Sequence, residues 1–323
     1  MDPAQAARSV APARPAREGR FSASDYADYL RTGQAELKDL TQINAETGSD
    51  MNPLGVTSGQ GMPHHLIRKL DRSAGLSAND KDALTRLVRE TAWFNTDQDL
   101  IDEGDTLRQV SVILNGWACC YKQLADGRRQ IIAYLLPGDV CSTPLVFPNL
   151  VDYSVRALTP VRTARIDGQD MLSTMERSAG IARAFWLDTL ATAAIQREWT
   201  ANVGLRTARE RIAHLFCEIV TRLHAVGLAD QDSCTLPLTQ EDLGEAVGLS
   251  AVHVNRTLQD LRASGLITLK RQQLTIPDFA ALRSVAHFDD SYLCRRAGPV
   301  FDANRVPASQ RLDVERVGPR MLA

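Results

Sequence analysis

The sequence lacks the features that would place the chain in a membrane or export it. Its longest uncharged apolar run, residues 131–138, is interrupted by Pro137, whereas a membrane-spanning helix needs about 18 or more apolar residues. The first twenty residues contain no apolar segment of the kind that a secretory signal requires. We therefore expect no membrane association and no export.

An excess of one charge sign and a regular cysteine framework are also missing. The 37 Lys and Arg residues face 39 Asp and Glu residues, for a formal net charge of −2. No global positive field therefore draws the chain to nucleic acid, and any such site must be local. The six cysteines form no Cys-x-x-Cys pair, which is typical of free thiols in a reducing compartment. This favours the cytoplasm.

Metal ligands are absent where a cofactor would need them. None of the six histidines lies between residues 100 and 167, the segment interpreted below as a β domain, and no cysteine precedes Cys119. This excludes a histidine-ligated metal or haem there and disfavours a four-thiolate iron–sulfur cluster. No nucleophile–base pair, phosphate-binding loop or pair of carboxylates indicates catalysis. The sequence predicts no cofactor, no metal site and no enzyme activity.

The 323 residues, 44% of them hydrophobic, suffice for two or three domains. Residues 1–61 contain few aliphatic side chains, so we expect a disordered N-terminal extension. The alternative is that translation begins at Met62. Residues 293–323 are modestly basic, and we expect a disordered tail there.

Residues 62–168 are predicted to form an antiparallel β-roll of the jelly-roll kind after a short helical start. Turn signals recur about every 11–12 residues from Gly104 to Gly138, as in antiparallel sandwiches and rolls. Asn115-Gly116 predicts a two-residue hairpin between strands at 110–114 and 117–121.

Residues 169–205 predict a long helix, because Gly and Pro are nearly absent and apolar residues recur every three or four positions. We interpret it as a dimerisation helix; the alternative is packing on the chain's own roll. A second helix is predicted over 207–226 and ends at Gly227. The predicted partner-facing residues of the first helix are Ile181, Phe185, Thr192, Ile195 and Trp199.

Residues 206–292 are predicted to form a winged helix-turn-helix, which makes the whole chain an α+β protein. Thr239 and Ser250 cap two short helices, and Gly248 makes the tight turn between them. Two short strands around a basic turn follow and form the wing. In this motif the start of the second helix enters the major groove of double-stranded DNA.

The predicted DNA contacts lie at the starts of these two helices. Arg256 suits a bidentate guanine contact, or alternatively a phosphate, and Asn255 suits adenine. Ala251 and Val252 suit thymine methyl groups, and His253 suits a phosphate or the solvated surface. The residues at the helix N-termini are expected to meet phosphates. The full set is Thr239, Gln240, Ser250, Ala251, Val252, His253, Asn255 and Arg256.

The β-roll, the long helix and the C-terminal winged helix-turn-helix together resemble the Crp/Fnr family of bacterial transcription regulators. The most specific stretches are 126–139 and 238–258. The resemblance implies a homodimer on a pseudopalindromic operator, a contact with RNA polymerase, and a small-molecule effector that the roll senses. Because Ala251 and Val252 replace the polar base-reading pair of many members, the usual target sequence is not expected.

The resemblance also locates a candidate effector pocket at Gly138, Asp139, Val140 and Arg156. Cyclic-nucleotide binders of this fold hold the cyclic phosphate with an Arg followed by a small hydroxyl residue, and here Val151 and Asp152 stand at those positions. This implies an effector other than a cyclic nucleotide. The open alternatives are thiol-redox sensing by Cys119, Cys120 or Cys141, and a small-molecule-binding adaptor or an enzyme built on the roll.

Overall fold

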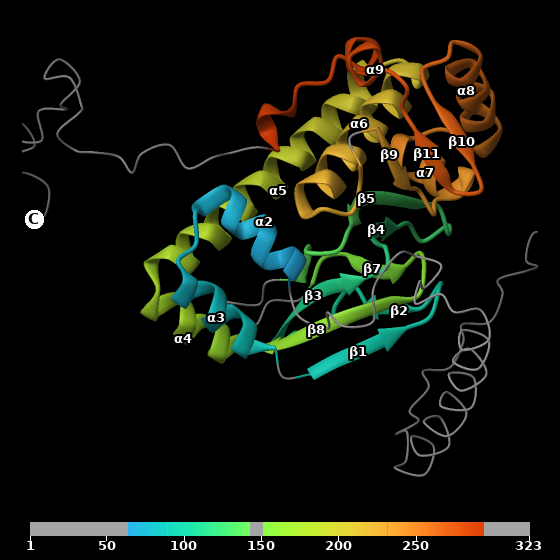
Figure 1. Cartoon of the computed structure of the whole chain (residues 1–323). Coiled ribbons are helices and arrows are strands. Elements are labelled where there is room, and N and C mark those ends of the chain that lie inside the picture. The colour runs from blue at the N-terminus through green and yellow to red at the C-terminus, as the bar shows by residue number, and fades with distance from the viewer. Residues whose placement is uncertain (1–63, 89, 143–150, 231, 294–323) are drawn as a thin grey trace, which may run out of the picture. The chain divides into compact units, whose positions relative to one another are not determined.

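The computed structural model describes residues 64–88, 90–142, 151–230 and 232–293 (Figure 1). The predicted N-terminal extension, and all of the predicted tail except Leu293, lie outside these ranges. Within them, no helix is both long and apolar enough to cross a membrane.

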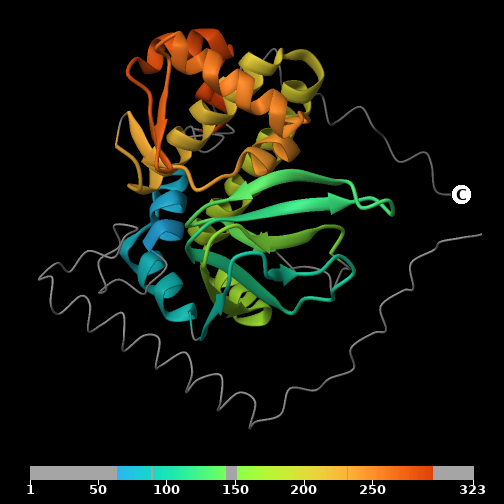
Figure 2. The same cartoon turned by 90° about the vertical axis from the view of Figure 1, so that its right-hand side faces the viewer.

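Two four-stranded antiparallel sheets form a β-roll and face each other (Figure 2). The first has the order β1 (Glu90–Phe94), β8 (Val161–Asp167), β3 (Gln109–Asn115) and β6 (Val140–Ser142). The second has the order β2 (Asp99–Ile101), β7 (Ser154–Ala157), β4 (Ala118–Gln123) and β5 (Arg129–Leu135). Strands of both sheets supply one buried apolar cluster, which includes Ile113, Cys120 and Val155. The predicted antiparallel roll is confirmed.

The predicted hairpin at Asn115-Gly116 is wrong. The strands on either side of it, β3 and β4, belong to different sheets and do not pair. Gly116 has a φ of 82°, and a Cβ there would lie 2.2 Å from the carbonyl oxygen of Pro160. Gly116 therefore lies in the connection that crosses from one sheet to the other. The prediction failed because a glycine suited to a positive φ indicates a turn without specifying which strands pair.

Four helices accompany the roll, two before it and two after it. They are α2 (His64–Ala74), α3 (Ala78–Leu87), α4 (Gly168–Arg177) and α5 (Ala179–Leu205). The single helix predicted over 169–205 is thus two helices that meet at Ser178. This residue has an extended backbone, and its hydroxyl accepts a hydrogen bond from the backbone N–H of Ile181. A serine that caps the second helix therefore ends the first.

The C-terminal part is a winged helix-turn-helix. Its helices are α6 (Ala208–Val226), α7 (Gln240–Val247), α8 (Ala251–Ala263) and α9 (Phe279–Ala286), followed by the short 3₁₀ helix η1 (Asp290–Tyr292). The wing strands β10 (Thr268–Lys270) and β11 (Gln273–Thr275) pair with a third strand that was not predicted, β9 (Ser233–Thr235). Gly227 ends α6 in the left-handed conformation, as predicted.

One apolar cluster joins this part to the roll. It combines the buried face of α6 with side chains of α7, α8 and the wing, and it also includes Trp117, Tyr134 and Trp199. Trp117 directly precedes β4, Tyr134 lies on β5 and Trp199 lies on α5. The winged helix-turn-helix and the roll therefore pack against a common core rather than being joined only by a linker.

Candidate nucleic-acid interface

Local hydrogen bonds shape the helix-turn-helix. The Thr239 hydroxyl accepts from the backbone N–H of Asp242 at 3.0 Å, and the Asp242 carboxylate accepts from the backbone N–H of Thr239 at 2.9 Å. This capping box starts α7. Gly248 ends it with a φ of 68°, and a Cβ on Gly244 would lie 2.4 Å from the carbonyl oxygen of Leu249. Glycine at 244 therefore lets the turn pack directly against α7.

The recognition helix α8 presents a separate outer face. Its inner residues, Val254, Thr257, Leu258 and Leu261, are buried. Among the predicted contacts, Ala251, Val252 and Arg256 are exposed, and 81% of Val252 is accessible. His253 and Asn255 are half-buried. The apolar side of α8 is thus committed to the core, while the predicted base contacts remain accessible.

The remaining predicted contacts lie where the helices begin. Thr239 and Ser250 are exposed N-caps, and Gln240 is the first residue of α7. The Ser250 hydroxyl accepts from the backbone N–H of His253 at 3.3 Å. Both helices therefore begin at the surface, and the N-terminus of a helix favours anions such as phosphate.

The wing contains a feature that residue-by-residue analysis missed. β10 and β11 are joined by Arg271 and Gln272, which have φ values of 49° and 63°. This two-residue turn requires the left-handed region at both positions, where Asn and Gly are favoured. Lys270, Arg271 and Gln272 are all exposed. The sequence indicated a basic turn between two short strands. It did not indicate that Arg271 and Gln272 adopt the left-handed backbone conformation.

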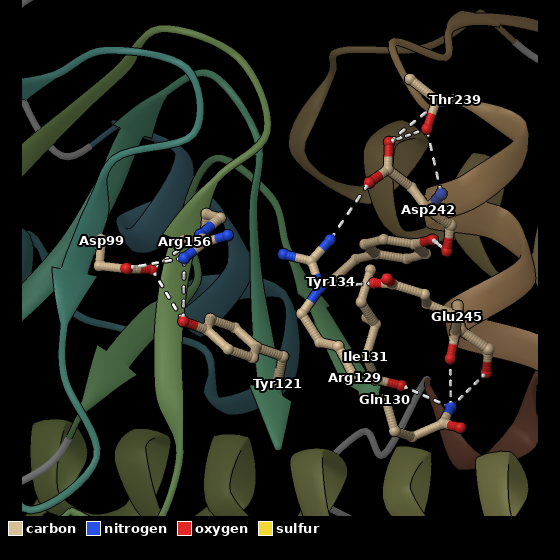
Figure 3. Close-up of polar contacts among 11 residues, drawn as sticks. Asp99, Tyr121, Arg129, Gln130, Ile131, Tyr134, Arg156, Thr239, Asp242 and Glu245 are labelled. Atoms are coloured by element: carbon tan, nitrogen blue, oxygen red, sulfur yellow. Dashed lines mark hydrogen bonds and ion pairs between the residues drawn. The ribbon is translucent and has the colours of Figure 1, made fainter. Parts of the chain in front are cut away.

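The β4–β5 hairpin of the roll contacts α7 (Figure 3). Arg129 Nε donates to Glu245 Oε2 at 2.6 Å. The Gln130 side-chain amide donates to the carbonyl oxygens of Glu245 and Ala246. The Tyr134 hydroxyl donates to the carbonyl oxygen of Asp242 at 2.9 Å. No sequence signal marks this contact, because more than a hundred residues separate its two sides.

A chain of largely shielded ion pairs ties the roll to α2, α5 and α6. Lys69 Nζ lies 2.8 Å from Asp139 and 2.7 Å from Asp188, and Arg222 lies 2.6 Å from Asp139 and 3.2 Å from Glu218. Burial by itself would raise the pKa of Asp139, but the positive charges of Lys69 and Arg222 hold it below its usual value. Burial raises the pKa of Glu218, against the pull of Arg222. Asp139 is therefore part of the domain junction.

A cavity of about 640 Å³ opens between the β5–β6 connection and helices α2, α5 and α6. Of the four predicted pocket residues, Asp139 and Val140 line it, whereas Gly138 and Arg156 do not. A Cβ on Gly138 would lie 2.8 Å from the backbone carbonyl carbon of His65. Arg156 donates two hydrogen bonds, each of 2.9 Å, to the Asp99 carboxylate. Gly138 is therefore packed against α2, and Arg156 is held by Asp99 within the second sheet.

The predicted partner-facing residues of α5 are mostly turned inward. Ile181, Phe185 and Trp199 are buried in this chain, and Ile195 packs partly against its core; only Thr192 is exposed. The predicted partner-facing role of the three buried residues is therefore wrong, because they pack within their own chain, whereas that of Thr192 stays a prediction. The exposed apolar residues of α5 are instead Trp186, Leu190, Val203 and Leu205. A 3.6-residue period reveals an apolar face without revealing whether the chain's own roll or a partner covers it.

The cysteines of the roll are poorly suited to redox sensing. Cys119, Cys120 and Cys141 are buried and free. Burial raises the pKa of Cys119 to about 12 and that of Cys120 well above its usual value. Burial therefore disfavours the thiolate, which is the reactive form of cysteine. No group of three or more His, Cys, Asp or Glu side chains in the described ranges is placed to hold a metal ion.

A β-roll joined by a long helix to a winged helix-turn-helix defines a two-domain DNA-binding transcription regulator. Residues 91–178 match the model of the cyclic nucleotide-binding domain, and residues 210–285 match that of the Crp-like helix-turn-helix domain. The chain belongs to the Crp/Fnr family of transcription regulators.

Relatives and a solved structure agree with this assignment. The chain is 30% identical over 202 residues to the transcriptional activator protein FnrL of Cereibacter sphaeroides, covering 61% of this chain and 80% of the relative. It is 25% identical over 224 residues to the nitrogen fixation regulation protein FixK of Azorhizobium caulinodans, covering 69% of this chain and 90% of that relative. The structure of FixK2 from Bradyrhizobium japonicum has a TM-score of 0.54 at 24% identity, covering 62% of this chain and 98% of that one.

Proposed function

We propose that two copies of this chain bind a pseudopalindromic operator through α8 and regulate transcription from it. The observation that carries the proposal is the open outer face of α8, where Val252 and Arg256 are exposed while Val254 and Leu258 are buried. Arg256 reads a guanine with two donors, and Ala251 and Val252 contact thymine methyl groups. The N-termini of α7 and α8 hold phosphates and set the register.

The wing adds a phosphate contact through Arg271. Its strained turn supports this role, because left-handed residues other than glycine cost free energy and are retained mainly where they serve a function. The exposed Lys270 beside it adds a second positive charge. Charges of this kind strengthen binding to every DNA sequence alike.

The dimer forms along the exposed stripe of α5. Trp186 and Leu190 are four residues apart, and Ala193 and Arg197 continue the same face at spacings of three and four, which is the spacing of a coiled-coil seam. Trp186 is 67% exposed in the single chain. Large apolar side chains on one helix face favour a partner helix.

The effector occupies the cavity that Asp139 and Val140 line. Much of its wall is aliphatic, and the ammonium of Lys69 and the guanidinium of Arg222 on it are already paired with carboxylates. This favours an uncharged, largely apolar small molecule over a cyclic nucleotide. Because the cavity also meets α5 and α6, a bound molecule would touch both domains.

Two further assignments complete the proposal. The relative from C. sphaeroides carries the name of a transcriptional activator, which supports a contact with RNA polymerase. The free thiols of the five described cysteines suit a reducing compartment, and we place the protein in the cytoplasm.

The test is selection of bound sequences from a pool of randomised DNA duplexes by the full-length chain, followed by sequencing. We expect a two-fold symmetric motif whose half-sites are about one helical turn, 34–36 Å, apart. Footprinting should protect both half-sites together. Retention that falls with salt but enriches no sequence would contradict the proposal.

A further inference from the structure

Helix α7 depends on the roll for the hydrogen bonding of its C-terminal end. The last carbonyls of a helix have no partner within it and must be satisfied from outside. The Gln130 side chain of the roll donates to the carbonyl oxygens of Glu245 and Ala246, and Arg211 of α6 donates to that of Val247 at 3.0 Å. A roll side chain thus forms part of the C-terminal cap of a DNA-binding helix.

A partly shielded ion pair lies beside this cap. Arg129 Nε and Glu245 Oε2 are 2.6 Å apart, and the two side chains are only 17% and 20% exposed. Asp242 adds a second carboxylate 4.0 Å from the same guanidinium. Shielding from water makes such a pair stronger than one at the open surface, and it makes the loss of one partner costly.

The contact leaves the DNA-binding surface free. It uses Asp242, Glu245 and Ala246 of α7, whereas Thr239, Ser250 and the outer face of α8 remain accessible. The turn between α7 and α8 is tight, with Gly244 packed against Leu249, so the position of α8 depends on that of α7. A group that holds α7 therefore also orients α8.

On the other side, the contact reaches into the second sheet. The Arg129 guanidinium lies over the Tyr121 ring, 5.2 Å from its centroid. Arg156 lies 5.1 Å from the same centroid and donates to the Tyr121 hydroxyl at 3.2 Å. Figure 3 shows this succession from Asp99 through Arg156 and Tyr121 to Arg129 and then to α7. Arg129 is thus held in place by the framework of the roll.

We propose that Arg129 and Gln130 are positioning residues, through which the sensor roll holds α7 and α8 in the orientation that binds operator DNA. The inference rests on the proposed function, since it concerns how the same recognition helix is presented.

The test is a charge exchange between the roll and α7 in the full-length chain. Arg129→Glu, Glu245→Arg and the double variant are compared with the wild type by fluorescence anisotropy on the selected operator. We expect each single variant to bind about tenfold more weakly, on the scale of coupling between sites. The double variant should return to within about threefold of the wild type, because the pair is restored with reversed polarity.

The sign of the Glu245→Arg effect separates positioning from simple attraction. If Arg129 only attracted phosphates, Arg129→Glu would weaken binding, Glu245→Arg would strengthen it by adding positive charge, and no rescue by pairing would appear. Arg128→Glu is the matched control, because Arg128 makes its ion pair with Asp126 in the same hairpin and is 77% exposed. It should show only the small, salt-sensitive loss of a surface charge.

Gln130→Met tests the cap without changing charge, and thermal unfolding checks that every variant is folded. We expect weaker operator binding by Gln130→Met with the wild-type salt dependence retained. Unchanged affinity in both Gln130→Met and Arg129→Glu, or a failure of the double exchange to rescue, overturns the inference alone. A wild type that selects no DNA sequence contradicts the proposed function and, with it, the inference.

Discussion

At the scale of single residues, the outer face of α8 divides into an apolar and a charged part. Ala251 and Val252 open the helix with exposed aliphatic groups, and Arg256 lies about one and a half turns further on. Aliphatic side chains recognise methyl groups, whereas a guanidinium recognises the two acceptors of guanine. The operator is therefore expected to combine a thymine-rich step with a guanine in each half-site.

Replacing Arg256 by Ala should cost about 1–3 kcal/mol of binding free energy per half-site and relax the preference at one base pair. Anisotropy titrations of the operator and of its single-base variants measure both effects. Arg262→Ala, at the exposed end of the same helix, removes the same charge and should leave base preference unchanged. Equal losses on operator and random DNA for Arg256→Ala would reduce its role to a phosphate contact.

The wing turn is expected to lower the stability of the protein while it contributes to DNA binding. Replacing Arg271-Gln272 by Asn-Gly removes two left-handed residues that disfavour this conformation, so the free energy of unfolding should rise by about 1 kcal/mol. DNA affinity should fall for all sequences, with the salt slope shallower by about one. Gln272→Gly alone should raise stability in urea unfolding without changing affinity. A double variant that binds as tightly as the wild type would show that Arg271 does not touch DNA.

At the scale of elements, α5 serves two surfaces. Ile181 and Phe185 pack toward α2 and the first sheet, and Trp199 packs toward α6 with its indole N–H donating to Glu218. The face with Trp186 and Leu190 is left accessible. One helix thus supports the chain's own core and is expected to provide the seam of the dimer.

Trp186→Glu combined with Leu190→Glu should produce monomers, because carboxylates facing each other across a two-fold axis repel and cannot be buried. Light scattering at micromolar concentration measures the mass. Trp93→Glu replaces a tryptophan of similar exposure on β1 and should remain dimeric. If the α5 double variant is still a dimer, the dimer forms through another surface.

In α6, His214 makes stability dependent on pH. Its side chain is 1% exposed, and burial together with nearby Arg206 lowers its pKa to about 3. Glu198 lies 3.6 Å away but is 33% exposed, so it does not offset burial. Because the unfolded chain takes up this proton near pH 6.5 while the folded chain does not, stability is fully present above that pH and is lost as pH falls toward 3.

Between pH 7 and pH 5 this single group should cost about 2 kcal/mol of unfolding free energy. His214→Leu should remove that part of the pH dependence in urea unfolding measured at both values. His224→Leu, on the exposed side of the same helix, should keep the wild-type dependence. Identical pH profiles for wild type and His214→Leu would mean that His214 titrates freely in the folded state.

At the scale of the whole molecule, the roll and the DNA-binding part share a core and a chain of ion pairs. A molecule bound in the cavity beside Asp139 would therefore alter contacts on α5 and α6 at once. This arrangement suits control of DNA affinity by an effector, provided that the effector distinguishes two arrangements of these contacts.

Cyclic AMP and cyclic GMP should neither bind at micromolar concentration nor change operator affinity. Asp152 repels a phosphate, Val151 offers no donor side chain, and the guanidinium of Arg156 is held by Asp99. Calorimetry with the full-length protein, and operator titrations with and without nucleotide, check this. A micromolar dissociation constant accompanied by tighter operator binding would refute it.

The parts of the fold that depend on neighbouring residues were predictable. Thr239, Gly248 and Ser250 act within a few positions of themselves, and the capping box and left-handed turn occur where their residue types indicate. Gly227 ends α6 for the same reason. The predicted DNA contacts remain predictions, although the structure leaves Ala251, Val252 and Arg256 accessible.

What the sequence by itself determined is the local geometry and the order of the two domains, because caps, turns and apolar periods act over a few residues. The tertiary structure alone decided which surfaces meet. It separated β3 from β4, turned Ile181 and Trp199 inward, engaged Arg156 with Asp99, and brought Arg129 to Glu245 across 116 positions. Contacts over such separations depend on how the whole chain closes, and no short-range pattern encodes them.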